Sequence, residues 1–186
     1  MNKYVRVMDG LKSNAGGFEY KLDEINIADN WNSKADNPEE MGGFNFGIED
    51  KILRWLHRGD TIYDVIIPDD TEVIMCNKEK GVYRANKIIV TNPRKLTDEL
   101  IIELYKKNTL SDKIIAECLV TLVWKDRSKV AKYIIDDYLN NDNIDIIIKR
   151  FEEYSSDNNF NYNTLHPSIK EVYDLLITKR KDIKGE

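Results

Sequence analysis

Glycine is concentrated in the first half of this 186-residue chain. Eight of the nine glycines lie between residues 10 and 81, and residues 82–184 contain none. Glycine permits tight turns but weakens helices, so this distribution predicts a turn-rich first half and a helical second half. We therefore expect an α+β fold, in which a small mixed or antiparallel sheet domain with one helix, residues 1–95, is followed by an all-α helical domain, residues 96–186.

The first half contains short segments rich in β-branched and aromatic residues that end in turn residues, which is the pattern of strands. One helix is predicted over residues 48–57, because apolar side chains recur there at helical spacing and Gly59 follows as a stop signal. The expected strands are residues 4–8, 18–22, 62–67, 73–76, 82–83 and 87–90.

In the second half, apolar side chains recur three and four residues apart, after residues that commonly begin helices. The pattern predicts about five helices, and the short connections between the first four favour antiparallel packing of neighbours. The expected helix starts are Thr97, Ser111, Ser128, Asn143 and Pro167.

Composition bears on which partners are expected. Lys and Arg number 28 against 33 Asp and Glu, giving a net charge of −5. The chain therefore lacks the basic surface that phosphate binding needs, and direct binding of double-stranded DNA is not expected. No apolar run approaches the roughly 20 residues of a membrane span, and the N-terminus lacks the apolar region of a signal peptide, so we expect a protein of the host-cell cytoplasm without a membrane partner. Cys76 and Cys118 are isolated and are interpreted as small buried hydrophobes, with no metal site.

The first candidate binding segment is Gly42–Gly47, with the sequence GGFNFG, directly before the predicted helix. Glycines let a backbone approach a ligand closely, and the N-terminus of the following helix favours an anion. The alternative is structural, with the glycines forming a bend and Phe44 and Phe46 packing in the core.

The second candidate is the polar loop from Asp29 to Glu40. Loops of this length in compact domains are often functional or disordered. Trp31 serves there either as a binding anchor or as a hydrophobe that pins the loop. The acidic residues would address a basic partner surface, and the predicted partner-binding residues are Asp29, Trp31, Asp36, Glu39 and Glu40.

The order of the elements in residues 1–95 resembles a reduced ADP-ribosyltransferase core, as in small uncharacterised phage and prophage proteins that add a helical tail. The features that carry the resemblance are Arg6 on the first strand, Phe18-Glu19-Tyr20, Gly43–Phe46 before a helix with an aromatic residue, Asp64–Pro68, and a last strand before Pro93.

This resemblance implies a site for NAD. Arg6 would bind the NAD phosphates, and a late glutamate would stabilise the positive charge of the transition state. The segment 83–87, where that glutamate is expected, contains none, and Glu72 is the remaining candidate. The other cofactor-binding residues that the resemblance implies are Gly43, Phe44, Phe46 and Tyr63.

The incomplete catalytic set favours a binding function without catalysis and without a cofactor. We expect a phage or mobile-element protein that inhibits a host defence factor, for example a nucleic-acid-binding protein, through the acidic loop. One alternative is an NAD-dependent ADP-ribosyltransferase that uses Glu72 to modify a host macromolecule. Another is a structural module that forms oligomers through the helices between Ser111 and Tyr154.

Overall fold

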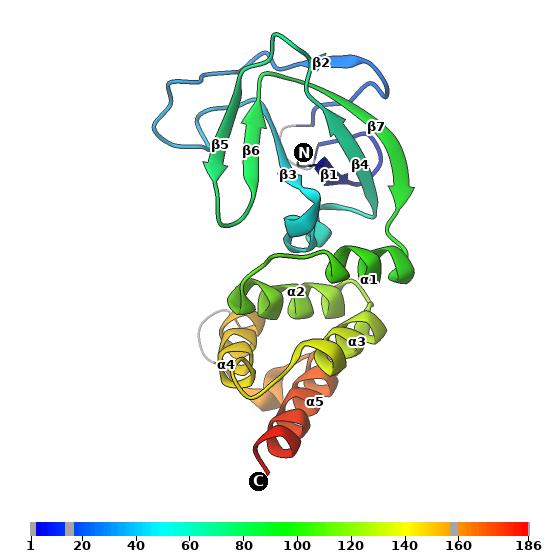
Figure 1. The fold of residues 1–186 in the computed structure, drawn as a ribbon, viewed down its shortest axis with the longest axis vertical. Coiled ribbons are helices and arrows are strands. Elements are labelled where there is room, and N and C mark those ends of the chain that lie inside the picture. Colours follow the sequence, from blue (N-terminus) through cyan, green and yellow to red (C-terminus); the bar gives the residue numbers. More distant parts are fainter. Residues whose placement is uncertain (1–2, 14–16, 157–159, 186) are drawn as a thin grey trace. The chain divides into compact units, whose positions relative to one another are not determined.

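The computed structural model describes residues 3–13, 17–156 and 160–185, which fold into two compact units (Figure 1). The sheet unit comprises the described residues up to Thr97 together with Lys107–Thr109. The helical unit comprises Asp98–Lys106 and the described residues from Leu110 onward.

The sheet unit is built on a seven-stranded antiparallel sheet with the strand order β2-β7-β4-β1-β3-β6-β5. β1 is the middle strand and pairs with β3 on one side and β4 on the other. At the β5 edge, the register with β6 shifts between Met75 and Asn77, which marks a bulge. The strands are β1 (Tyr4–Met8), β2 (Ile25–Ile27), β3 (Phe44–Ile48), β4 (Thr61–Ile66), β5 (Val73–Asn77), β6 (Val82–Ala85) and β7 (Lys87–Lys95).

The predicted fold class is wrong in its description of the sheet domain. Instead of a small sheet with one helix followed by an all-α domain, the structure is an α+β fold with a large seven-stranded antiparallel sheet followed by several helices. Two strands, β2 and β3, lie in segments for which no strand was predicted, and residues 18–22, predicted as a strand, contribute only isolated bridges. The segment predicted as a helix is a 3-10 helix, η1 (Glu49–Arg58).

The residues of β3, which include Gly47, explain part of this error. Phe44 and Phe46 are buried and alternate with Asn45, which is the pattern of a strand rather than of a bend. Gly47 pairs with both Val5 and Val82 across neighbouring strands, where a glycine usually marks close approach of another group. Here that group is Trp55 of η1, because a Cβ at position 47 would lie 3.3 Å from its indole nitrogen.

The apolar core of the sheet unit draws on most of its strands. Phe44 lies edge-on to Phe18, with ring centroids 4.9 Å apart, and Phe46 stacks on Tyr83. The buried members of this core are Met8, Tyr20, Phe44, Phe46, Tyr63, Val65, Ala85, Ile88 and Val90.

The helical unit packs around α2, of which nine of thirteen residues are buried. Such an all-round apolar helix is stable only when neighbours cover most of its surface, and α3, α4 and α5 do so. None of the described helices has the length and apolarity needed to cross a membrane. The helices are α1 (Asp98–Lys106), α2 (Asp112–Trp124), α3 (Ser128–Tyr138), α4 (Ile144–Ser155), the short 3-10 helix η2 (Tyr162–Thr164) and α5 (Pro167–Lys184).

The buried side chain of Asn26 helps to fix β2 to the sheet through hydrogen bonds with the backbone. Its Oδ1 accepts from the backbone N–H of Lys21 at 2.8 Å, and its Nδ2 donates to the carbonyls of Lys21 and Glu24 at 3.0 and 3.1 Å. We expect Asn26→Ala to lower the free energy of unfolding by about 1–3 kcal/mol, because it leaves buried backbone groups unsatisfied. Asn26→Asp keeps the acceptor but not the donor and should also destabilise, whereas exposed Asn141→Ala should not. Urea unfolding followed by circular dichroism measures the difference, and equal stability of Asn26→Ala and Asn141→Ala would contradict this role.

Candidate anion-binding site

Arg6 extends from the middle strand of the sheet into a pocket. Its Nη1 donates to both the backbone carbonyl and the side-chain Oδ1 of Asn45 on β3. Its guanidinium carbon lies 5.0 Å from the ring centroid of Tyr20, a cation–π contact. Its Nε is buried and has no hydrogen-bond partner among the described residues. One N–H of a buried, charged group is therefore left without an acceptor in the described chain.

The surroundings of Arg6 are positively charged. Burial is the largest influence and lowers the pKa of Arg6, the neighbouring Tyr20 acts in the opposite direction, and the charges of Arg58 and Arg84 lower it further. The guanidinium nevertheless keeps its charge, because arginine is not deprotonated in proteins. In the described part of the chain, no carboxylate forms an ion pair with Arg6. An anion is the ligand that would relieve this repulsion.

Trp55 supplies a second buried donor to the same pocket. It lies on η1, and its Nε1 is buried without a hydrogen-bond partner in the described chain. The guanidinium carbons of Arg54 and Arg58 lie 4.9 and 5.4 Å from its ring centroid, so the indole makes cation–π contacts with both. The glycine at position 47 leaves the space that this indole occupies.

The pocket is small. About 40 Å³ is accessible to the centres of water-sized molecules, and a single water needs on the order of 10–15 Å³ by that measure. This volume suits a small anion or one phosphoryl group, but not a whole dinucleotide. The lining contains no carboxylate and consists of Val5, Arg6, Val7, Met8, Ser13, Asn45, Phe46, Gly47, Ile52, Trp55 and Arg58.

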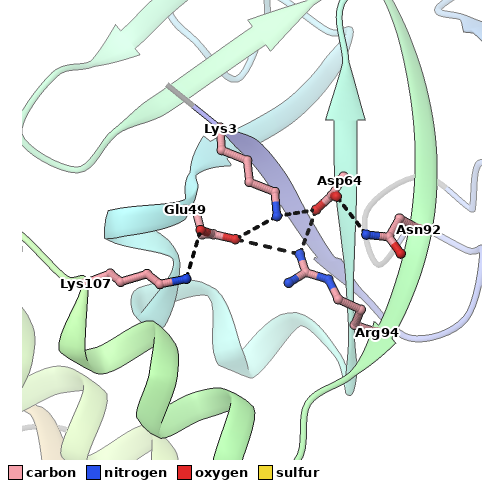
Figure 2. Close-up of polar contacts among 6 residues, drawn as sticks. All are labelled: Lys3, Glu49, Asp64, Asn92, Arg94 and Lys107. Atoms are coloured by element: carbon pink, nitrogen blue, oxygen red, sulfur yellow. Dashed lines mark hydrogen bonds and ion pairs between the residues drawn. The ribbon is translucent and has the colours of Figure 1, made fainter. Parts of the chain in front are cut away.

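A network of ion pairs fixes the start of η1, the element that carries Trp55. Lys3 Nζ lies 3.0 Å from Glu49 Oε1 and 3.1 Å from Asp64 Oδ1. Arg94 Nη2 donates to Asp64 Oδ1 at 2.6 Å, and Asn92 Nδ2 donates to Asp64 Oδ2 at 2.9 Å. Figure 2 shows how the network joins η1 to β4 and β7 through Lys3, Glu49, Asp64, Asn92, Arg94 and Lys107.

Paired carboxylates such as Glu49 and Asp64 also occur in acid–base catalysis. Here, however, the cations of the network compensate both negative charges. Partial burial acts to raise the pKa of Asp64, yet hydrogen bonds from Asn92 and Lys3 and the charge of Arg94 outweigh it and hold that pKa below its usual value. A catalytic acid needs the opposite shift. The network therefore has a structural role, which is to hold η1 over the pocket.

The structure separates the residues predicted for NAD binding and transfer. Arg6 and Phe46 line the pocket. Phe44 packs in the core instead, and buried Tyr63 donates its hydroxyl to the carbonyl of Gly10 at 3.0 Å. Glu72 is exposed immediately before β5, outside the pocket lining, and accepts a hydrogen bond of 2.5 Å from the indole of Trp31.

Trp31 and Gly43 pin the polar loop to the sheet. Gly43 has a φ of +68°, and a Cβ there would lie 2.5 Å from the Trp31 ring and 2.7 Å from the carbonyl of Ala85. Glycine is therefore needed for both the backbone conformation and the close approach of the indole. The four acidic residues predicted to bind a partner, Asp29, Asp36, Glu39 and Glu40, are all exposed on this loop.

Sequence reasoning missed two of the polar residues that line the pocket, Asn45 and Arg58, and noted Trp55 only as an aromatic residue in a helix. The local signal was the segment Arg54-Trp55-Leu56-His57-Arg58, in which two arginines flank a tryptophan on one amphipathic element. Its meaning depends on the glycine of β3 that faces it, and sequence spacing does not reveal that pairing.

Comparison of the chain with known proteins does not assign a function to this pocket. No protein-family model, curated protein or solved structure has significant similarity to the chain. Within residues 3–13, 17–156 and 160–185, no cluster of three or more His, Cys, Asp or Glu side chains is placed to hold a metal ion.

The lowered pKa of Asp64 predicts how stability depends on pH. Because the pKa is lower in the folded than in the unfolded chain, where it is about 3.9, Asp64 contributes stability above that value and loses it as the pH falls further. Asp64→Asn should therefore cost about 1–3 kcal/mol at pH 6, and the gap to the wild type should shrink toward pH 3.

Urea unfolding of both proteins at pH 6, 4 and 3 measures this gap, with Asp29→Asn as an exposed control. A difference between the wild type and Asp64→Asn that stays constant across these pH values would show that the charge of Asp64 does not contribute.

Proposed function

We propose that the sheet unit binds an anion of the phosphate class in the pocket between β1, β3 and η1. The observation that carries the proposal is the buried Nε of Arg6, which has no hydrogen-bond partner in the described chain. A buried donor left unsatisfied costs about 1–3 kcal/mol, and more when the group is charged. A phosphate oxygen would accept from it in a charge-assisted hydrogen bond.

The remaining geometry supports a phosphate over a neutral ligand. Asn45 fixes the guanidinium of Arg6 through Nη1, so its orientation is set before a ligand arrives. The indole N–H of Trp55 offers a second donor, and Arg58 lines the same pocket. Preorganised donors lose little conformational entropy on binding. The small volume favours inorganic phosphate or the phosphoryl end of a larger molecule whose remainder stays outside.

Binding rather than group transfer is the activity that this arrangement supports. Arg6 lies where the resemblance to ADP-ribosyltransferases would place a phosphate ligand. The carboxylate proposed for transfer, Glu72, hydrogen-bonds to Trp31 and does not line the pocket. A nucleotide such as NAD is therefore one candidate source of the bound phosphate group and not a substrate for transfer.

Thermal unfolding with and without phosphate tests this proposal. We expect about 10 mM inorganic phosphate to raise the Tm, because a ligand that binds only the folded state stabilises it. Arg6→Gln should abolish the shift, and Trp55→Phe, which keeps a ring but removes the N–H, should weaken binding about tenfold, or about 1.4 kcal/mol.

Arg127→Gln is a matched control, because Arg127 lies in the helical unit and pairs with Asp98. A parallel titration with NAD separates the two ligand sources. If neither ligand shifts the Tm of the wild type, or if Arg6→Gln responds as the wild type does, the proposal fails.

We also propose that the loop from Asp29 to Glu40 binds the basic surface of a host factor, as expected for an inhibitor carried by a phage or mobile element. The loop is organised without a partner. Trp31 donates to Glu72, Asn32 N–H donates to the carbonyl of Met41 at 2.8 Å, and Glu40 N–H donates to the carbonyl of Asn37 at 3.0 Å. Exposed carboxylates on an ordered loop favour rapid, charge-steered association.

Neutralising the loop tests this second function. A variant with Asp29→Asn, Asp36→Asn, Glu39→Gln and Glu40→Gln should lose a partner that the wild type captures from host lysate at low salt. The control neutralises four exposed acids of the helical unit, Glu103, Asp126, Asp142 and Asp182. Equal capture by the two variants would exclude the loop as the contact surface.

A further inference from the structure

The helical unit exposes large apolar side chains along one line of its surface. Trp124, at the end of α2, is 59% exposed, and Ile146 and Tyr154 of α4 are 43% and 37% exposed. Single exposed hydrophobes are ordinary, but a tryptophan this exposed beside further apolar side chains is typical of an interaction surface.

Contacts between α2 and α4 place these side chains in one seam. Near the start of α2, Lys113 lines a shallow pocket with Ile146 and Lys149 of α4, and the accessible volume of this pocket is about 260 Å³. At the other end, the ring of Trp124 stacks on that of Tyr154 with centroids 6.3 Å apart. From residue 113 to residue 124 the seam spans about 16 Å, or three helical turns.

The middle of the seam is held rigid. Arg150 donates to Glu117 through Nε and Nη2, at 3.0 and 2.5 Å, and to Glu153 through Nη1 at 3.0 Å. Its guanidinium carbon also lies 5.9 Å from the ring centroid of Tyr154. Tryptophan, tyrosine and arginine are the residues most often found at binding hot spots, and their order here reduces the entropy lost on binding.

The charges of the seam indicate the chemistry of its partner. The charge of Arg150 is met by Glu117 and Glu153. Lys113 and Lys149 are exposed, and neither forms an ion pair with any carboxylate in the described part of the chain. Two unpaired cations beside the exposed Ile146, on a protein of net charge −5, favour an acidic partner over a basic one.

We propose that this α2–α4 seam binds an acidic amphipathic helix of a partner protein. The groove between two helices accepts the apolar ridge of a third, with anchors spaced three and four residues apart. Apolar side chains of the partner helix contact Ile146 and the outer face of Trp124. Its flanking carboxylates pair with Lys113 and Lys149. The proposal concerns the helical unit alone and does not depend on phosphate binding by the sheet unit.

Fluorescence anisotropy with labelled peptides tests the proposal on the full chain. The probe is a synthetic helix of four turns with leucines on one face and glutamates on both flanks. The comparison peptides are the same helix with lysines in place of glutamates and an acidic peptide of the same composition without helical periodicity. We expect saturable binding of the probe with a Kd in the micromolar range. The double variant Lys113→Glu/Lys149→Glu, and separately Trp124→Ala, should each weaken it by at least about tenfold.

The matched control is Lys129→Glu/Lys181→Glu, which reverses two exposed lysines of the same unit away from the seam and should change the Kd less than about twofold. Circular dichroism confirms that each variant is folded. The proposal is overturned by absence of saturable binding up to about 1 mM probe, by equal affinity for either comparison peptide, or by variants that bind as the wild type does. Preferential binding of a labelled single-stranded oligonucleotide would assign the seam to nucleic acid instead. Dimerisation in light scattering that Trp124→Ala abolishes would assign it to a second copy of this chain.

Discussion

Desolvation of the Arg6 guanidinium is the constraint around which the sheet unit is arranged. A charge in the middle strand of a sheet is costly unless polar groups surround it. Asn45 meets part of that requirement with two acceptors, and Tyr20 contributes the face of its ring. Its Nε has no partner in the described chain, and Arg6 lines a pocket together with a second cation, Arg58. The cost of burying this charge is thus coupled to the capacity to bind an anion.

The ion-pair network at the start of η1 shows how the rest of the unit supports that pocket. Glu49 begins η1 and is tied through Lys3 and Arg94 to Asp64 on β4. Trp55 lies within the same 3-10 helix, so the position of its indole depends on where the helix starts. Glu49 and Asp64, the carboxylates that most resemble a catalytic pair, therefore have a structural role. The polar groups that line the pocket itself are cations and neutral side chains.

Elements that depend on a local residue pattern could be predicted from the sequence. Contacts that depend on pairing between distant strands could not. Strands at residues 4–8 and 73–76 were predictable because apolar and β-branched residues precede turns. β3 was missed because the glycines in and before it were read as a bend. Gly43 instead leaves room for Trp31 and Gly47 for Trp55, and these contacts are not predictable from sequence spacing. The position of Arg6 on a strand was predicted, but its contact with Asn45 depends on the pairing of β1 with β3. Register of this kind is set by the whole sheet. The pairing of Glu72 with Trp31 joins residues 41 positions apart and likewise has no local signal.

The bulge in β5 has a consequence for how the molecule behaves in concentrated solution. An open sheet has two edge strands that are free to pair with neighbouring molecules, and a long, flat edge strand promotes aggregation. One edge strand, β2, is only three residues long. The other, β5, has a bulge between Met75 and Asn77. A short edge strand and a bulged edge strand are two features that limit pairing with a strand of another molecule.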